Sequence, residues 1–162
     1  MSQRYLIALG SNMRHHRFGP PERVLTAALA ELAQRGIKVT AAGPVVRSAP
    51  IGPSLRRYAN SAAVVKWERS PEDLLLTLKE IERAFGRRAG GQRWTSRVLD
   101  LDIVLWSGGV WSSPLLTIPH LLFRERDFVL KPAAAIAGQW RDPVTGLTLR
   151  QLVARLARPL RI

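Results

Sequence analysis

The stretch Arg93-Trp94-Thr95-Ser96-Arg97-Val98-Leu99-Asp100-Leu101-Asp102-Ile103-Val104-Leu105-Trp106 decides the fold, because it places two carboxylates inside an otherwise apolar strand. The run of apolar residues predicts that this strand is buried. Side chains alternate across a strand, so Asp100 and Asp102 should project from one face with their Cβ atoms about 7 Å apart. The opposite face, toward a core, is expected to hold Leu99, Leu101, Ile103 and Leu105.

Two carboxylates this close need a compensating cation. At an effective dielectric constant near 20 they repel each other by roughly 2 to 3 kcal/mol, and partial burial adds a desolvation cost. Arg93 and Arg97 could form ion pairs with them. Alternatively, Asp100 and Asp102 could hold one or two Mg²⁺ ions, since Mg²⁺ binds carboxylate oxygen when it also carries substrate phosphates. The residues alone leave both alternatives open.

Length and composition predict a single domain, residues 1–162, with a sizeable core. The sequence contains no Cys, which excludes disulfides and thiolate metal sites and suits a reducing compartment. No apolar run approaches the about 18 residues of a membrane span, and the N-terminus leads directly into a strand. We therefore expect a cytoplasmic protein without a signal peptide or a membrane partner.

The formal net charge is +13, and 21 of the 25 basic residues are arginine. Guanidinium groups match phosphate oxygens, so the charge predicts an anionic partner, either nucleic acid or a phosphorylated small molecule. A codon bias toward arginine would produce the same count. The positions of the arginines are therefore more informative than their number.

Hydrophobic periodicity and turn signals predict the order strand, helix, strand, strand, helix, strand. The expected ranges are 4–9, 20–36, 37–47 with an interruption at Gly43-Pro44, 58–67, 70–86 and a strand at Asp100. This order is typical of a ferredoxin-like α+β sandwich. C-terminal additions should follow, including short helices at 119–126 and 129–137, a turn at 142–146 and an amphipathic helix at 148–156.

Several motifs occur in a specific order along the chain: Leu9-Gly10-Ser11-Asn12, Gly52-Pro53, Tyr58-Ala59-Asn60, Gly86-Arg87, Arg93-Trp94, Arg97-Val98-Leu99-Asp100-Leu101-Asp102-Ile103, Pro119-His120 and Arg126-Asp127-Phe128-Val129-Leu130. With them the chain resembles the 6-hydroxymethyl-7,8-dihydropterin pyrophosphokinases of folate biosynthesis. The resemblance implies a ferredoxin-like sandwich that transfers pyrophosphate from ATP to the pterin hydroxymethyl oxygen, releasing AMP, with two Mg²⁺ ions. It also implies small-molecule substrates, and we expect a monomer.

The resemblance assigns residues to the metal and pterin sites. Asp100 and Asp102 would hold both metal ions and take part in catalysis. Asn60 would bind the pterin edge, since an amide offers both a donor and an acceptor. Tyr58 and Phe128 would stack on the two faces of the ring; the alternative for each is a plain core residue. The remaining pterin-side positions are Ala49, Pro50, Ile51 and Trp94.

A second set of residues matches family positions on the ATP side: Arg87, Arg97, Ile103, Thr117, His120, Arg126 and Glu82. Arg87 and Arg97 are the candidates for catalytic residues that stabilise charge as the bond to the α-phosphate oxygen breaks. His120 could instead cap a helix, and Glu82 could instead be a surface acid near Arg83. The basic, glycine-containing segment 87–96 predicts a mobile lid over ATP, with Trp94 as its apolar plug.

The chain departs from the family at Ala89, Thr95-Ser96, Leu121 and Ala135. These departures leave open a divergent paralogue that keeps the fold without the activity. A second alternative is an RNA-recognition module, which stacks bases on aromatic residues of its central strands. Segments 6–9 and 59–63 contain no aromatic residue, so the sequence disfavours nucleic acid as a partner. His15 and His16 receive no role.

Overall fold

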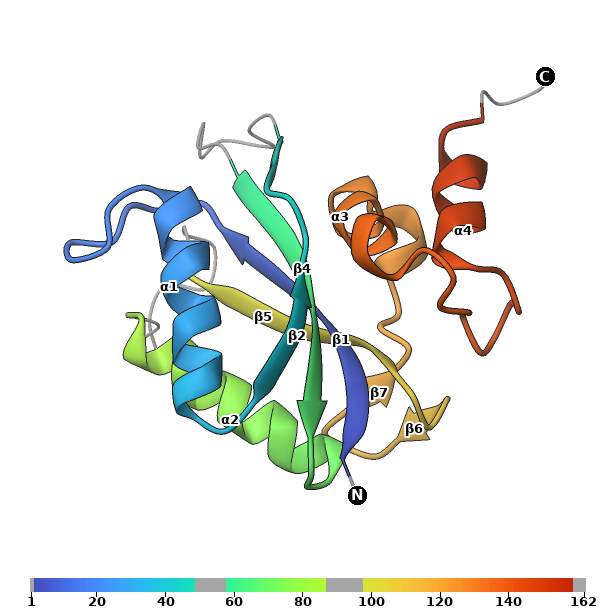
Figure 1. The fold of residues 1–162 in the computed structure, drawn as a ribbon, viewed down its shortest axis with the longest axis horizontal. Coiled ribbons are helices and arrows are strands. Elements are labelled where there is room, and N and C mark those ends of the chain that lie inside the picture. Colours follow the sequence, from blue (N-terminus) through green and yellow to red (C-terminus); the bar gives the residue numbers. More distant parts are fainter. Residues whose placement is uncertain (1, 49–57, 87–97, 159–162) are drawn as a thin grey trace.

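The computed structural model describes residues 2–48, 58–86 and 98–158, which form a mixed α/β fold around an antiparallel sheet (Figure 1). The sheet has five strands in the order β2-β4-β1-β5, and β3 also pairs with β4. The elements, in chain order, are β1 (Gln3–Ser11), α1 (Pro21–Gln34), β2 (Lys38–Ala42), β3 (Val46–Ser48), β4 (Tyr58–Trp67), α2 (Pro71–Ala84), β5 (Asp100–Trp106), β6 (Trp111–Ser112), β7 (Thr117–Ile118), a 3₁₀ turn (Phe123–Glu125), α3 (Asp127–Ala137) and α4 (Leu149–Leu156). The predicted helices at 20–36 and 70–86 and the predicted strands at 4–9, 58–67 and Asp100 are confirmed in their order, whereas one further strand lies before β4.

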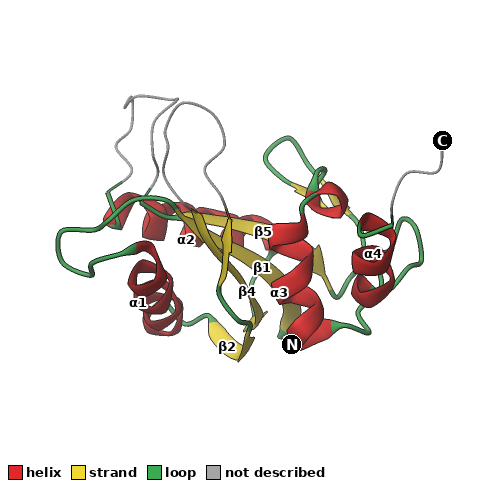
Figure 2. Ribbon diagram, turned by 90° about the horizontal axis from the view of Figure 1, so that it is seen from above, coloured by secondary structure: helices red, strands yellow, loops and turns green. Residues whose placement is uncertain are grey.

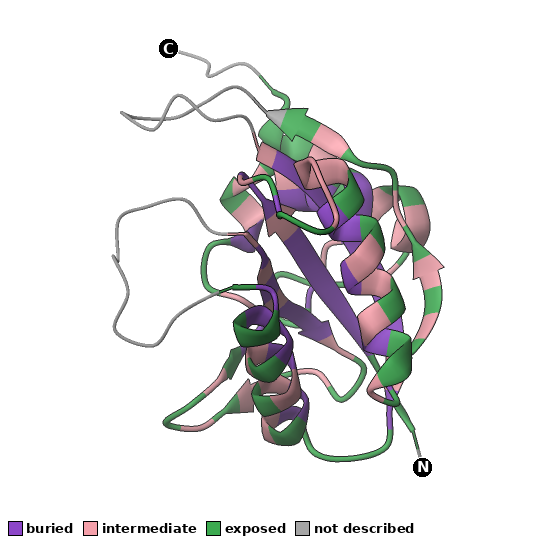
Figure 3. Ribbon diagram, turned by 90° about the vertical axis from the view of Figure 1, so that its left-hand side faces the viewer, coloured by how far each residue is buried: buried purple, intermediate pink, exposed green. Residues whose placement is uncertain are grey.

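Helices cover both faces of the sheet (Figure 2). Helices α1 and α2 pack on one face through Leu25, Leu32, Leu78 and Ile81, against alternate residues of β1, β4 and β5. Helices α3 and α4 pack on the other face in a second apolar cluster, which is the second core of the protein. The central strands are consequently buried on both sides (Figure 3). None of the helices within the described ranges is long and apolar enough to cross a membrane.

The predicted face of Leu105 is wrong because β5 contains a register shift. Leu105 pairs with Leu6, whereas Ile103 pairs with Ile7, so Val104 is an extra residue on β5. An extra residue of this kind reverses the alternation beyond it. Leu105 therefore packs in the second cluster, under α3 and α4, and not beside Ile103.

Four other expectations need correction. The strand at 37–47 is two separate strands, β2 and β3, which pair with different parts of β4. The predicted helix at 119–126 is only the 3₁₀ turn Phe123–Glu125, and α3 begins earlier than predicted, at Asp127. Strand β1 does not end at Leu9 but continues through Gly10 and Ser11.

The predicted helix starts at Ser70 and Thr148 are confirmed. The Ser70 hydroxyl accepts a hydrogen bond from the Asp73 backbone N–H at 3.1 Å, as an N-cap residue does. Thr148 and Gln151 form a reciprocal capping box at the start of α4.

Candidate active site

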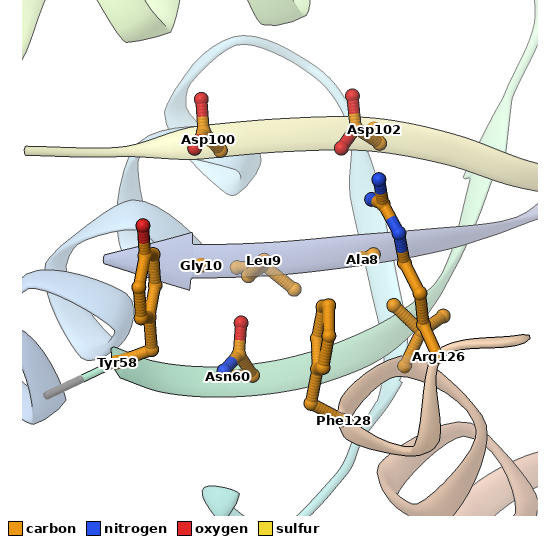
Figure 4. A pocket seen from close by; sticks show the side chains of 10 residues that line it. Ala8, Leu9, Gly10, Tyr58, Asn60, Asp100, Asp102, Arg126 and Phe128 are labelled. Carbon is orange, nitrogen blue, oxygen red and sulfur yellow. The ribbon is translucent and has the colours of Figure 1, made fainter. Parts of the chain in front are cut away.

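A pocket of about 340 Å³ lies on the α3 side of the sheet, where β1, β4 and β5 meet the start of α3 (Figure 4). Its lining residues are Ala8, Leu9, Gly10, Tyr58, Asn60, Asp100, Asp102, Arg126, Phe128 and Val129. The pocket thus brings together six of the residues predicted for the site: Tyr58, Asn60, Asp100, Asp102, Arg126 and Phe128.

Asp100 and Asp102 project side by side from β5 into this pocket (Figure 4). Both are half-buried, whereas Leu101 between them is fully buried in the core on the opposite face. Their partners on β1 are Gly10 and Ala8, the two smallest residue types. The small side chains leave the space in front of the carboxylates open. The prediction that the two aspartates share one face is confirmed.

Asn60 lies at the floor of the pocket and is only 6% exposed. It pairs with Gly10 across β1 and β4, and a Cβ atom added at Gly10 would lie 3.0 Å from the Asn60 Oδ1. Its Nδ2 atom is buried and has no hydrogen-bond partner among the described residues. A buried amide N–H without a partner costs free energy unless a ligand supplies an acceptor. Asn60 therefore has a buried amide N–H for which the described residues supply no acceptor, while its Oδ1 points toward Gly10 (Figure 4).

Tyr58 and Phe128 stand on either side of Asn60 (Figure 4). Tyr58 is the first residue of β4, and Phe128 comes from the first turn of α3. Both rings are half-buried. The alternative that they are plain core residues does not account for their place in the pocket lining. A flat ring between them would find two aromatic surfaces and an amide edge.

Arg126 and His120 lie on the Asp102 side of the site. Arg126 precedes α3, extends toward Asp102 (Figure 4), and has its guanidinium carbon 5.8 Å from the centre of the Phe128 ring. The His120 backbone N–H donates to the Val104 carbonyl at 3.0 Å, which fixes His120 beside β5. Cationic and neutral donors are therefore placed next to the carboxylate pair, as a phosphate ligand would require.

The protonation state of His120 follows from its contacts. Its Nδ1 atom accepts a hydrogen bond from the Leu122 backbone N–H at 3.1 Å, so the neutral ring carries its proton on Nε2. Burial lowers the pKa of His120, and the charge of Arg126 lowers it further, whereas Asp102 acts in the opposite direction. His120 is thus a neutral Nε2–H donor. It also caps the turn after it, so the site and capping interpretations are compatible.

Besides His120, three further predicted ATP-side residues of the described chain lie outside the pocket lining. Thr117 is exposed on β7. The Ile103 side chain is 3% exposed and packs in the core on the opposite face from Asp102, so only its backbone faces the pocket side. Glu82 is 1% exposed, and the suggestion that it is a surface acid is wrong. Its Oε2 accepts from the Leu101 backbone N–H at 2.8 Å, and its Oε1 lies 3.3 Å from the Lys79 Nζ.

The other predicted site residues lie outside the described part of the chain: Arg87, Arg97, Ala49, Pro50, Ile51 and Trp94. The predicted lid at 87–96 and the proposed ion pairs of Arg93 and Arg97 with the aspartates also fall there. These remain predictions.

Sequence reasoning missed Gly10, Ala8 and His15. Gly10 lies just beyond the predicted end of the first strand at Leu9, but its strand pairing with Asn60 shows that it makes room for that side chain. His15 is 8% exposed, and its Nδ1 accepts from the backbone N–H groups of Arg17 and Phe18 at 3.0 and 3.2 Å. Its ring also packs on Phe85 at the end of α2. No local pattern signals this contact, because Phe85 is distant in sequence.

The donor set fits metal ions that arrive with a substrate. No cluster of three or more His, Cys, Asp or Glu residues that could hold a metal occurs among the residues that the structure describes. Asp100 and Asp102 alone would not enclose an ion. Mg²⁺, however, is usually bound by one or two carboxylates, with substrate phosphates and water as the other ligands. The half-buried pair suits that role.

Comparisons with known proteins agree with the family resemblance of the motifs. The family model for 7,8-dihydro-6-hydroxymethylpterin-pyrophosphokinase (HPPK) matches residues 6–138. The chain is 38% identical to a 2-amino-4-hydroxy-6-hydroxymethyldihydropteridine pyrophosphokinase of Synechocystis over 93% of this chain and 75% of that protein. It is 36% identical to the protein of the same name from Pseudomonas aeruginosa, over 95% of this chain and 92% of that one.

A solved structure with a similar fold is the HPPK-DHPS protein of Plasmodium falciparum, at a TM-score of 0.71 and 12% identity. The match covers 96% of this chain but only 42% of the Plasmodium chain, so it supports the fold alone. The family model and the bacterial relatives carry the assignment. This chain belongs to the 7,8-dihydro-6-hydroxymethylpterin-pyrophosphokinase family.

Proposed function

We propose that this protein transfers a pyrophosphoryl group from ATP to the hydroxymethyl group of 6-hydroxymethyl-7,8-dihydropterin. A bond forms between the hydroxymethyl oxygen and the β-phosphorus of ATP, and the bond from that phosphorus to the oxygen of the α-phosphate breaks. AMP leaves with that oxygen, and the hydroxyl proton passes to solvent. The names of the bacterial relatives and the matched family support this reaction.

The observation that carries the proposal is a pocket that brings together two aromatic rings, a pair of carboxylates and the Asn60 amide, whose Nδ2 has no acceptor among the described residues. A pterin is a flat ring whose edge carries both acceptors and donors, so it would fill the space between Tyr58 and Phe128 and satisfy the Nδ2 of Asn60. The same pocket would place its hydroxymethyl group close to Asp100 and Asp102. One site thus suits both the acceptor and the phosphates.

The remaining residues divide between metal binding and phosphate binding. Asp100 and Asp102 would hold two Mg²⁺ ions, which neutralise phosphate charge when bound. Arg126 would bind phosphate oxygens through its guanidinium group, and His120 through its Nε2–H. Arg87 and Arg97 are proposed as further phosphate ligands on the family resemblance. Catalysis would then rest on positioning and electrostatic stabilisation of the transferred group.

We also propose that the core is a single ferredoxin-like domain. With the short strand β3 set aside as an addition beside β4, the order β1, α1, β2, β4, α2, β5 and the sheet order β2-β4-β1-β5 support this assignment. An RNA-recognition role is less well supported, because α3 and α4 pack on the sheet face opposite α1 and α2. Base stacking on the sheet would need one of these faces to be open.

The test is to incubate the protein with ATP, Mg²⁺ and 6-hydroxymethyl-7,8-dihydropterin and to measure AMP. We expect AMP only when the pterin is present. Asp100→Asn and Asp102→Asn should each reduce its formation by about a thousandfold or more, because each removes a charged ligand that positions the phosphates. The matched control is Asp73→Asn, which changes an exposed acid on α2.

The alternatives give different results. ATP binding without AMP formation by the unmodified protein would indicate a paralogue that has lost the activity. Salt-sensitive RNA binding without AMP formation would favour a nucleic-acid module. Either result would overturn the proposed function.

A further inference from the structure

A buried ion pair connects the turn before α3 to the segment that leads into α4. The Asp142 side chain is fully buried, with 0% of its surface exposed. Its two oxygens accept from the Arg124 Nε at 2.6 Å and the Arg124 Nη2 at 2.8 Å. This is the bidentate arrangement, which fixes the relative orientation of the two groups as well as their distance.

Asp142 also organises the turn in which it lies. Its Oδ1 accepts from the Val144 backbone N–H at 3.0 Å, and its Oδ2 accepts from the Thr145 hydroxyl at 2.7 Å. Its backbone N–H donates to the Leu147 carbonyl at 2.8 Å, and its carbonyl accepts from the Gly146 N–H at 2.8 Å. Every polar group of Asp142 is therefore engaged. The segment after Trp140 presents a rigid carboxylate to Arg124.

Arg124 lies in the short turn that carries the two ATP-side residues of the pocket region. The backbone N–H of Phe123 donates to the His120 carbonyl, and that of Arg126 donates to the Phe123 carbonyl at 3.3 Å. The Phe123 ring is buried in the second core, and the Arg124 guanidinium carbon lies 4.7 Å from its centre. Arg124 is thus two residues from Arg126 and four from His120, within one hydrogen-bonded turn.

The ion pair between Arg124 and Asp142 is not needed to attach α4 to the protein, because the α4 side chains Leu149 and Leu152 are already buried in the second core. A buried ion pair is also weak evidence for stability, since desolvation offsets its attraction. Here burial would raise the pKa of Asp142, but hydrogen bonds from Arg124, Thr145 and Val144 and the charge of Arg124 bring it down to about 2. The carboxylate therefore stays charged under all working conditions. What the pair adds is a fixed position for the turn at 120–126.

We propose that Asp142 is a positioning residue for nucleotide binding, which acts through Arg124 to hold His120 and Arg126 in place. The inference rests on the proposed function of these two residues as phosphate ligands. Asp142 lies beyond residue 138, where the match to the family model ends. The affinity for the nucleotide therefore depends on a residue outside the range 6–138 that the family model matches.

The test is Asp142→Asn, which keeps the shape of the side chain and removes its charge. We expect the Kd for a non-hydrolysable ATP analogue, measured by calorimetry with Mg²⁺, and the KM for ATP to rise about tenfold, as expected when ligands are misplaced by a remote change. The Kd for the pterin should stay within twofold, because Asn60 and Tyr58 lie on β4 and Phe128 is held within α3 by its packing on the second cluster. Arg124→Lys keeps the charge but loses the bidentate contact, so it should give a smaller rise in the same constants.

Two controls separate positioning from a merely structural role. Glu31→Gln breaks a half-buried ion pair with Arg35 on α1, far from the turn at 120–126 in the sequence, and should change none of the constants. The double variant Asp142→Asn with Arg124→Lys should be no worse than Asp142→Asn alone, since both act through one contact. If Asp142→Asn fails to fold, the Kd of Arg124→Lys for the ATP analogue tests the positioning role in its place.

The inference is overturned if the variants lower the melting temperature but leave the Kd for the ATP analogue unchanged. It is equally overturned if the affinities for the ATP analogue and the pterin fall together. These results are distinct from a failure of the proposed function, which would be seen as no AMP formation by the unmodified protein. The nucleotide affinities would still test the positioning role in that case.

Discussion

Gly10 and Asn60 are paired across β1 and β4, and the Asn60 Oδ1 lies close to the position that the Cβ atom of a side chain on residue 10 would take. An added Cβ would stand 3.0 Å from that oxygen, closer than such contacts normally are. The absence of a side chain at Gly10 therefore lets the Asn60 amide lie in its pocket position. The site depends on this one close approach between neighbouring strands.

Gly10→Ala should therefore weaken pterin binding. The new methyl group pushes the Asn60 amide away from its present position, and we expect the Kd for the pterin to rise about tenfold, which corresponds to about 1.4 kcal/mol. Calorimetric titration with the pterin would measure it. In an Asn60→Ala background the same change should have little further effect, because the group on which it acts is gone. Equal losses in both backgrounds would show that Gly10 acts by another route.

Asn60→Leu should separate stability from binding. Leu has nearly the same shape as Asn and removes a buried donor that has no partner among the described residues. The free energy of unfolding should be unchanged or rise by up to about 1 kcal/mol, while the Kd for the pterin rises by about a hundredfold or more. Urea unfolding and calorimetry measure the two quantities. A clear loss of stability would mean that the amide is satisfied within the protein.

Glu82→Ala should destabilise the fold. It would leave the Leu101 backbone N–H buried without its acceptor, at a cost of about 2 kcal/mol. For a chain of this size the melting temperature should fall by roughly 4 to 8 °C. The matched control is Glu80→Ala, two residues away on α2, where a 57% exposed side chain pairs with Arg35 and the effect should be within about 0.5 kcal/mol. Similar melting temperatures for the two variants would contradict this structural role.

His15 should make stability depend on pH. Burial lowers the pKa of His15 below its ordinary value of 6.5, and the charges of His16 and Arg17 lower it further. Below pH 6.5 the unfolded chain therefore binds more protons at this residue than the folded protein does. The free energy of unfolding should fall as the pH falls through this range, by at most about 1.4 kcal/mol per pH unit for one proton.

The variant His15→Asn tests this assignment, because an amide oxygen can accept the same backbone hydrogen bonds but does not titrate near neutral pH. Urea unfolding between pH 7.5 and 5.5 should show a shallower pH dependence for His15→Asn than for the unmodified protein. His16→Ala, a change at an exposed neighbour, should keep the steep dependence. An unchanged slope in His15→Asn would exclude His15 as its source.

Local patterns predicted much of the fold. The spacing of apolar residues identified α1, α2, β1, β4 and β5, and the predicted helix starts at Ser70 and Thr148 agree with the structure. These signals are local: a 3.6- or 2-residue period and a side chain that bonds a nearby backbone N–H do not depend on distant contacts. The same alternation placed Asp100 and Asp102 on one face.

Features that depend on pairing between distant segments were not predicted. The register shift that moves Leu105 to the second core arises from the pairing of β5 with β1. The burial of Glu82 depends on α2 lying against β5, and the role of Gly10 depends on which residue of β4 lies opposite. The 3₁₀ turn at Phe123–Glu125 replaced a predicted helix, and its Arg124 pairs with Asp142.

The sequence by itself determined most of the helices and strands. It also determined that Asp100 and Asp102 project from the same side of one strand, because side chains alternate between the two faces wherever a strand occurs. Only the tertiary structure decided what stands around those carboxylates. Asn60, Phe128 and Arg126 come from other elements, and their positions depend on sheet register and on the packing of α3. Register is set by the burial of both faces at once, which is a property of the whole chain and not of any short stretch.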